Sequence, residues 1–97
     1  MFKSLFPTGE IVATPGALSV LEESQESVMK YLVLHLQGDW GCVCEEDKKM
    51  NTAAIQSGAR ILSAYILDND TKIWVITEAT DDDGNRADTT ILLPDEY

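Results

Sequence analysis

The fold is decided by residues 59–79, ARILSAYILDNDTKIWVITEA. β-Forming residues dominate positions 59–67, and polar and apolar side chains alternate with a period of two over positions 72–79. The tripeptide DND at positions 68–70 separates the two runs and is typical of a tight turn. The stretch therefore predicts two antiparallel strands joined by a short turn.

A third strand follows at residues 88–93 and is ended by Pro94. Between the second and third runs lies the turn cluster 80–87, which contains DGN at positions 83–85. Two successive short loops predict an antiparallel β-meander.

Before Gly58 the apolar residues follow helical spacing instead. Thr14 is a suitable N-cap, and Pro15 suits the first position of a helix because its missing N–H has no partner there anyway. The predicted helices are residues 15–23, a helix that begins after Ser24 or Ser27 and ends at Gly38, and Glu45–Ser57, which Gly58 closes.

The inner faces of the second and third helices follow from the same spacing. His35 lies off the apolar stripe of the second helix, so we expect it to be exposed or half-buried. On the third helix we expect Met50, Ala53 and Ala54 to face inward. The stripe of the second helix contains Val28, Met29, Leu32, Val33 and Leu36.

The first residues contain a short apolar segment and one extended segment. We expect Phe2, Leu5 and Phe6 to pack on the body of the protein, and Glu10–Ala13 to be extended, with its place in the sheet left open. Residues 1–97 are therefore predicted to form a single α+β domain, with N-terminal helices packed on one face of a small C-terminal antiparallel β-meander.

The charge of the chain is strongly negative and unevenly spread. The formal net charge is −10, and residues 68–97 alone carry −7, because nine acidic residues face only Lys72 and Arg86 there. Such a charge repels nucleic acids and anionic membranes and attracts basic surfaces. We therefore predict a basic protein partner, with no direct nucleic-acid or membrane binding.

The apolar runs and the cysteines indicate a cytoplasmic protein. No apolar run approaches the roughly 20 residues that cross a bilayer. Pro7 interrupts the first apolar segment before a signal peptide could form. Cys42 and Cys44 lie too close together for an ordinary structural disulfide, which favours reduced thiols in a reducing compartment.

Catalytic and metal sites are poorly supported. Cys42, Cys44 and His35 together fall short of a four-ligand zinc site, so we interpret the cysteines as small residues packed beside Trp40. His35 is the only histidine, and neither a serine nucleophile elbow nor a glycine-rich phosphate loop is present. We therefore predict no catalytic residue, no cofactor and no metal ligand.

The run of aspartates at residues 81–83 invites comparison with a calcium loop. When Gly84 is aligned with the loop glycine of an EF-hand, Thr90 occupies the twelfth position, where a bidentate glutamate is needed. The predicted flanking elements are strands instead of helices. We therefore interpret the run as a solvated turn, with a weak, nonspecific divalent-ion site as the alternative.

An acidic interaction surface is the most specific site hypothesis. Trp74 shares a predicted strand face with Lys72 and Glu78, so it is either an interface anchor or a lid of the core against a helix. The two acidic turns are expected at opposite ends of the meander. The predicted partner-binding residues are Asp68, Asp70, Trp74, Glu78, Asp81, Asp82, Asp83 and Asp88.

Several motifs spread over nearly the whole chain resemble one protein family. They are LFPTG (5–9), VATPGA (12–17), HLQGDWG (35–41), ED (46–47), ILSAY (61–65), IWVITEA (73–79) and LLPDEY (92–97). The chain resembles small proteins of plasmids and other mobile elements, often labelled "plasmid-related protein" or "type I restriction endonuclease subunit M". Residues 80–87 look longer than is usual in this pattern. The resemblance implies no activity, and the methyltransferase label fails because so short a chain, with no glycine-rich cofactor loop, cannot house that fold.

Three functional hypotheses follow, in this order. The first is a noncatalytic anti-defence inhibitor, anti-CRISPR or anti-restriction, that uses carboxylates as phosphate or DNA mimics against a basic nucleic-acid-binding protein. The second is an accessory structural or homodimeric interaction protein of a plasmid or phage with no inhibitory role, in which the homodimer would pair through a sheet edge. The third is an enzyme or a metal protein.

Overall fold

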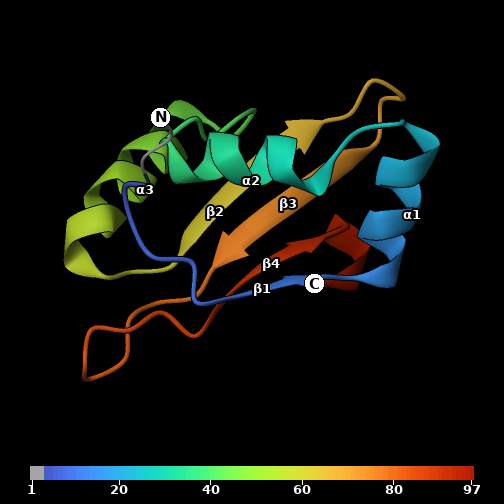
Figure 1. Cartoon of the computed structure of the whole chain (residues 1–97). Coiled ribbons are helices and arrows are strands. Elements are labelled where there is room, and N and C mark those ends of the chain that lie inside the picture. The colour runs from blue at the N-terminus through green and yellow to red at the C-terminus, as the bar shows by residue number, and fades with distance from the viewer. Residues whose placement is uncertain (1–3) are drawn as a thin grey trace.

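The computed structural model describes residues 4–97 and shows a four-stranded sheet in the order β1-β4-β3-β2, with helices on one of its faces (Figure 1). The chain is therefore an α+β fold, as the sequence predicts. In chain order the elements are β1 (Glu10–Ala13), α1 (Pro15–Glu23), α2 (Val28–Leu36), α3 (Glu45–Ser57), β2 (Ile61–Ile66), β3 (Lys72–Thr77), β4 (Asp88–Leu92) and the 3₁₀ turn η1 (Pro94–Glu96).

Strands β2, β3 and β4 form the predicted antiparallel meander. Val75 in the middle of β3 lies opposite Ser63 on β2 and Ile91 on β4, which places all three side chains on the helix-covered face. The extended segment Glu10–Ala13 pairs with β4 in parallel and becomes the fourth strand. The sheet is therefore mixed, with an N-terminal strand added to the C-terminal meander.

The helices begin and end at the predicted signals. The Thr14 side chain accepts a hydrogen bond from the Ala17 amide at 3.1 Å, and of the two serines it is Ser27 that caps α2. Gly58 closes α3 with a left-handed backbone at φ 84°. Side-chain caps therefore define the starts of α1 and α2, and a left-handed glycine defines the end of α3.

Two adjoining clusters make up the core between the helices and the sheet. Phe6 is buried in the second cluster, as expected, whereas Leu5 is half-exposed and Phe2 lies outside the described residues. The first cluster contains Ala17, Leu21, Tyr31, Tyr65, Leu67, Ile73, Val75 and Ile91, and the second contains Phe6, Leu32, Leu36, Trp40, Ala54 and Ile61.

The predicted inner faces of α2 and α3 are partly wrong. Met29 and Met50 are exposed, and Ala53 is exposed as well, although Ala54 is buried. Polar residues take the inward positions because they find hydrogen-bond partners there. On α3, for example, the buried Asn51 bonds to the backbone of β2.

Within residues 4–97, no helix has both the length and the apolar character that a bilayer crossing demands.

Candidate interaction surface

The two acidic turns lie at opposite ends of the sheet (Figure 1). Asp68 and Asp70 belong to the turn between β2 and β3, here called the turn end. Residues 81–83 belong to the loop between β3 and β4, here called the loop end. The fold therefore separates the predicted partner-binding carboxylates into two groups instead of bringing them together.

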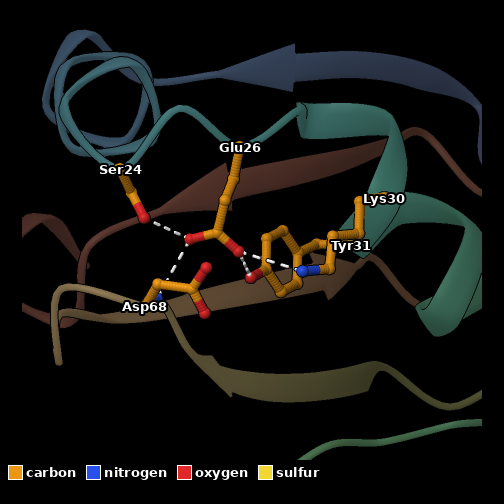
Figure 2. A network of polar contacts seen from close by, with 5 residues as sticks. All are labelled: Ser24, Glu26, Lys30, Tyr31 and Asp68. Carbon is orange, nitrogen blue, oxygen red and sulfur yellow. Dashed lines mark hydrogen bonds and ion pairs between the residues drawn. The ribbon is translucent and has the colours of Figure 1, made fainter.

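At the turn end, the carboxylate of Glu26 is the centre of a polar network (Figure 2). Its side chain is only 6% exposed. The hydroxyls of Ser24 and Tyr31 donate hydrogen bonds to it. The Asp68 backbone amide donates a third at 3.0 Å, and Lys30 Nζ forms an ion pair with it, also at 3.0 Å. Glu26 thus ties the α1–α2 connection to the β2–β3 turn.

These donors stabilise the charged form of Glu26. The hydrogen bonds from Ser24 and Tyr31, in that order, lower the pKa of Glu26 from 4.5 to about 2, although its burial acts in the opposite direction. Burial raises the pKa of the Tyr31 hydroxyl, and the hydrogen bond to Glu26 raises it further. The network is therefore charged and fully bonded at neutral pH, and it serves the fold.

At the loop end, Asp81 organises the loop with its own side chain. Its Oδ1 accepts hydrogen bonds from the amides of Asp83 and Asn85, both at 2.9 Å. The Asp81 amide donates to the Asn85 carbonyl at 2.8 Å, and Gly84 takes a left-handed backbone with open space around it. Asp81, Asp82 and Asp83 are all exposed, but Asp81 uses its Oδ1 inside the loop, so Asp82 and Asp83 carry the carboxylates that the loop presents to a partner.

Arg86 anchors the base of this loop, and no local sequence pattern predicts that it lies inside the protein. The residue is only 5% exposed. Its guanidinium donates to the carbonyls of Ala54, Ala59 and Glu78 at 2.9, 2.8 and 3.0 Å, and it lies 5.7 Å from the centre of the Phe6 ring. Burial lowers the pKa of Arg86.

Because Arg86 is buried, the loop carboxylates have no ion-pair partner within residues 4–97. Among the described residues, the ion pairs are Lys30 with Glu26 and Lys48 with Glu45, and neither involves the loop end. The positive charge at the base of the loop is instead directed at backbone carbonyls. The surface of the loop end is therefore more acidic than its composition indicates.

The register adds three carboxylates to this end of the sheet. Glu10 on β1 lies opposite Asp88 on β4, and the Glu78 amide donates to the Asp88 carbonyl at 3.0 Å. Paired positions share a sheet face, so the three side chains form a row across neighbouring strands. Glu10 was not predicted because nothing in its own segment shows which strand it pairs with. The loop-end surface comprises Glu10, Glu78, Asp81, Asp82, Asp83 and Asp88.

Trp74 lies on the sheet face opposite α1, α2 and α3, so it is not a lid of the core against one of these helices. It is half-buried, and its ring makes an edge contact with the ring of Tyr97 at 5.8 Å between centres. The Tyr97 hydroxyl accepts a hydrogen bond from Arg60. Trp74 is thus covered in part by the segment that follows β4.

The expectation that His35 is exposed or half-buried is wrong. His35 is fully buried, with Nδ1 at 2.5 Å from the Ser63 hydroxyl and Nε2 at 2.9 Å from the Thr77 hydroxyl. The series of hydrogen bonds continues from the Thr77 hydroxyl to the Thr89 hydroxyl at 2.8 Å, and Thr89 donates to the Thr8 carbonyl at 2.8 Å. Hydroxyl partners on β2, β3 and β4 allow a polar side chain inside the core.

The donor and acceptor roles along this series of hydrogen bonds assign the tautomer of His35. Thr89 uses its one hydroxyl hydrogen on the Thr8 carbonyl, so Thr77 must donate to Thr89. Thr77 then accepts from Nε2–H of His35, and Ser63 donates to Nδ1. Burial, assisted by the charge of Arg86, lowers the pKa of His35 to about 3, so the ring is neutral. The serine and the histidine are sealed in the core, where they hold the sheet to α2.

The cysteines do not pack beside Trp40 as expected. Cys42 and Cys44 are both exposed, and the intervening Val43 packs on the core in their place. Over residues 4–97, no group of three or more histidine, cysteine, aspartate or glutamate side chains is arranged to hold a metal ion.

Comparison of the chain with protein-family models, with curated proteins and with solved structures found no match.

Proposed function

We propose that this chain is a noncatalytic binding protein of a mobile genetic element that acts in the cytoplasm. It inhibits a basic nucleic-acid-binding protein of a host defence system, such as a CRISPR complex or a restriction enzyme. Its loop-end carboxylates occupy positions where the phosphates of the nucleic acid would otherwise lie.

One observation carries the proposal: at the loop end, acidic side chains face outward while the cation at the base faces inward. Asp82 and Asp83 are exposed, and Arg86 is bound to three backbone carbonyls. Uncompensated charge of one sign steers a partner of opposite charge and raises its association rate.

The order of the loop supports the same function. The Asp81 side chain and the Arg86 anchor hold the loop, and the Thr80 amide adds a hydrogen bond to the Gly58 carbonyl at 2.8 Å. A surface that is ordered before binding loses less conformational entropy when the complex forms. The carboxylates are therefore held at defined spacings, as phosphate mimicry requires.

The test compares charge reversal at the two ends. The double variant Asp82→Lys/Asp83→Lys changes the net charge by the same amount as Asp68→Lys/Asp70→Lys, and all four side chains are exposed. Both variants and the parent chain are used as bait in a host extract, and captured proteins are identified by mass spectrometry over a series of salt concentrations.

We expect the loop-end variant to lose a basic, nucleic-acid-binding partner at moderate salt, and the turn-end variant to retain it. The parent chain should also displace a DNA duplex from the purified partner. If both variants lose the partner equally, the interaction depends on net charge alone. If the loop-end variant retains the partner fully, phosphate mimicry is not the mechanism.

A further inference from the structure

The two edge strands of the sheet differ in whether their outward-pointing backbone groups are hydrogen-bonded. On β2, the outward groups of Leu62 are both bonded to the side chain of Asn51, at 2.8 and 3.2 Å. The outward groups of Ala64 are bonded to the Trp40 carbonyl at 3.2 Å and the Cys42 amide at 2.7 Å. The β2 edge is therefore closed by α3 and by the segment before it.

The β1 edge is open. The amides of Glu10 and Thr14 donate to Ala87 and Ile91 on the β4 side, at 3.1 and 3.0 Å. Because peptide groups alternate along a strand, the amides and carbonyls of Ile11 and Ala13 point away from β4. Within residues 4–97 no strand pairs with that side, since β1 ends the sheet.

The β1 edge also lacks the features that commonly protect a free edge. It has no lysine, proline or bulge, and Ile11 and Val12 are 50% and 41% exposed. Its protection is limited to its length of four residues and the single charge of Glu10. An edge of this kind accepts an added strand, with main-chain hydrogen bonds for affinity and side chains for selectivity.

The charges around the edge select its occupant. Glu10 lies on β1 itself, and the row continues across the same face to Asp88 and Glu78. A second copy of this chain would bring a further net charge of −10 to the interface, which opposes self-association. A basic strand has the complementary charge.

We propose that an extended basic segment of the partner adds to β1 as a fifth strand. Its main chain bonds to Ile11 and Ala13, and its alternate lysines or arginines face the row that begins at Glu10. This inference rests on the proposed function for the basic character of the partner, and it assigns the contact to a specific edge.

The test uses a synthetic peptide of alternating lysine and valine as the probe, with the full chain labelled with ¹⁵N. We expect saturating peptide to slow hydrogen exchange of the Ile11 and Ala13 amides by about tenfold or more, with no change on β2. A peptide of the same sequence, N-methylated at alternate residues so that it cannot pair, should bind more weakly.

Ile11→Pro is the variant that tests the added strand most specifically. It removes an amide that points away from β4, so the ladder to β4 is retained. We expect it to weaken peptide binding by about five- to tenfold, while Ile11→Thr, which keeps the amide, changes binding by about twofold or less. An unchanged circular dichroism spectrum and melting temperature would show that both variants are folded.

Three results would overturn the inference: no protection of Ile11 and Ala13, equal binding of the N-methylated peptide, or a dimer in sedimentation that Ile11→Pro dissociates. The proposed function is tested separately. Host capture that is lost in Asp82→Lys/Asp83→Lys but unaffected by Ile11→Pro would leave phosphate mimicry standing and remove the β1 contact alone.

Discussion

The two ends of the sheet use a buried charge in opposite ways. At the turn end a carboxylate, Glu26, is taken inside and bonded to hydroxyls, an amide and Lys30. At the loop end a guanidinium, Arg86, is taken inside and bonded to three carbonyls. The first arrangement withdraws negative charge from the surface, whereas the second withdraws positive charge.

This difference shows that the charge of a segment and the charge of its surface are separate quantities. Two aspartates lie in the turn between β2 and β3, and three lie in the loop between β3 and β4. The two ends also differ in the charged side chain that is buried, which is Glu26 at the turn end and Arg86 at the loop end. The loop end is the better candidate for binding a basic partner because its neighbouring cation is engaged by the fold.

The largest expected effect comes from removing the buried cation. Arg86→Met removes the donors of the Ala59 and Glu78 carbonyls and one of the two donors of the Ala54 carbonyl, at a side chain that is buried. We expect the free energy of unfolding to fall by about 3 kcal/mol or more. Urea denaturation at neutral pH measures the change.

Lys72→Met is the matched control for Arg86→Met, because it makes the same change in charge at an exposed position in the same part of the chain. It should alter stability by about 0.5 kcal/mol or less. If the two variants lose similar stability, Arg86 is not an anchor and the contrast between the two ends fails.

A smaller effect, with a definite pH dependence, is expected for Glu26→Gln. The variant removes a charged acceptor of several hydrogen bonds, so at pH 7 we expect a loss of about 1 to 2 kcal/mol. The folded-state pKa of Glu26 is lowered to about 2, so its stabilisation is complete above pH 4.5 and is lost as the pH falls toward 2. The stability gap between parent and variant should therefore narrow over that range.

Denaturation curves at pH 7, 4.5 and 3 test this, with the exposed Glu22→Gln as the control. His35 also destabilises the fold as the pH falls below 6.5, because its folded-state pKa is lowered to about 3. That contribution is common to the parent and both variants, so it cancels in the difference. A gap that stays constant with pH would contradict the role of the Glu26 charge.

The helices and the meander strands of this fold follow from local sequence. The pairing of β1 and the buried polar side chains that link distant elements do not. Thr14-Pro15, Ser27 and Gly58 are capping signals within a few residues of the helix ends they determine, and the three strands of the meander follow from period-two alternation and turn residues. The pairing of β1 with β4 joins segments almost 80 residues apart, and no residue of Glu10–Ala13 indicates it.

The candidate site divides in the same way. The exposure of Asp82 and Asp83 was predictable from turn chemistry. The burial of Arg86 and His35 was not, because their partners are backbone carbonyls and hydroxyls on distant elements. A histidine off an apolar stripe ordinarily faces solvent, and here Ser63 and Thr77 reverse that expectation.

The smallest expected effect lies within the loop end itself. Asp81→Ala removes the acceptor of the Asp83 and Asn85 amides, so we expect a loss of about 0.5 to 1 kcal/mol and faster hydrogen exchange at those two amides. Asp82→Ala removes the same charge from a side chain that accepts no hydrogen bond within residues 4–97, so stability and exchange should stay unchanged. Partner binding should be weakened in both variants, for different reasons. Asp82→Ala weakens it by removing a presented carboxylate, and Asp81→Ala weakens it by disordering the loop. If exchange at Asp83 and Asn85 is the same in both variants, the loop is ordered by its Arg86 anchor alone, and the carboxylate of Asp81 belongs with the presented charges of the loop end.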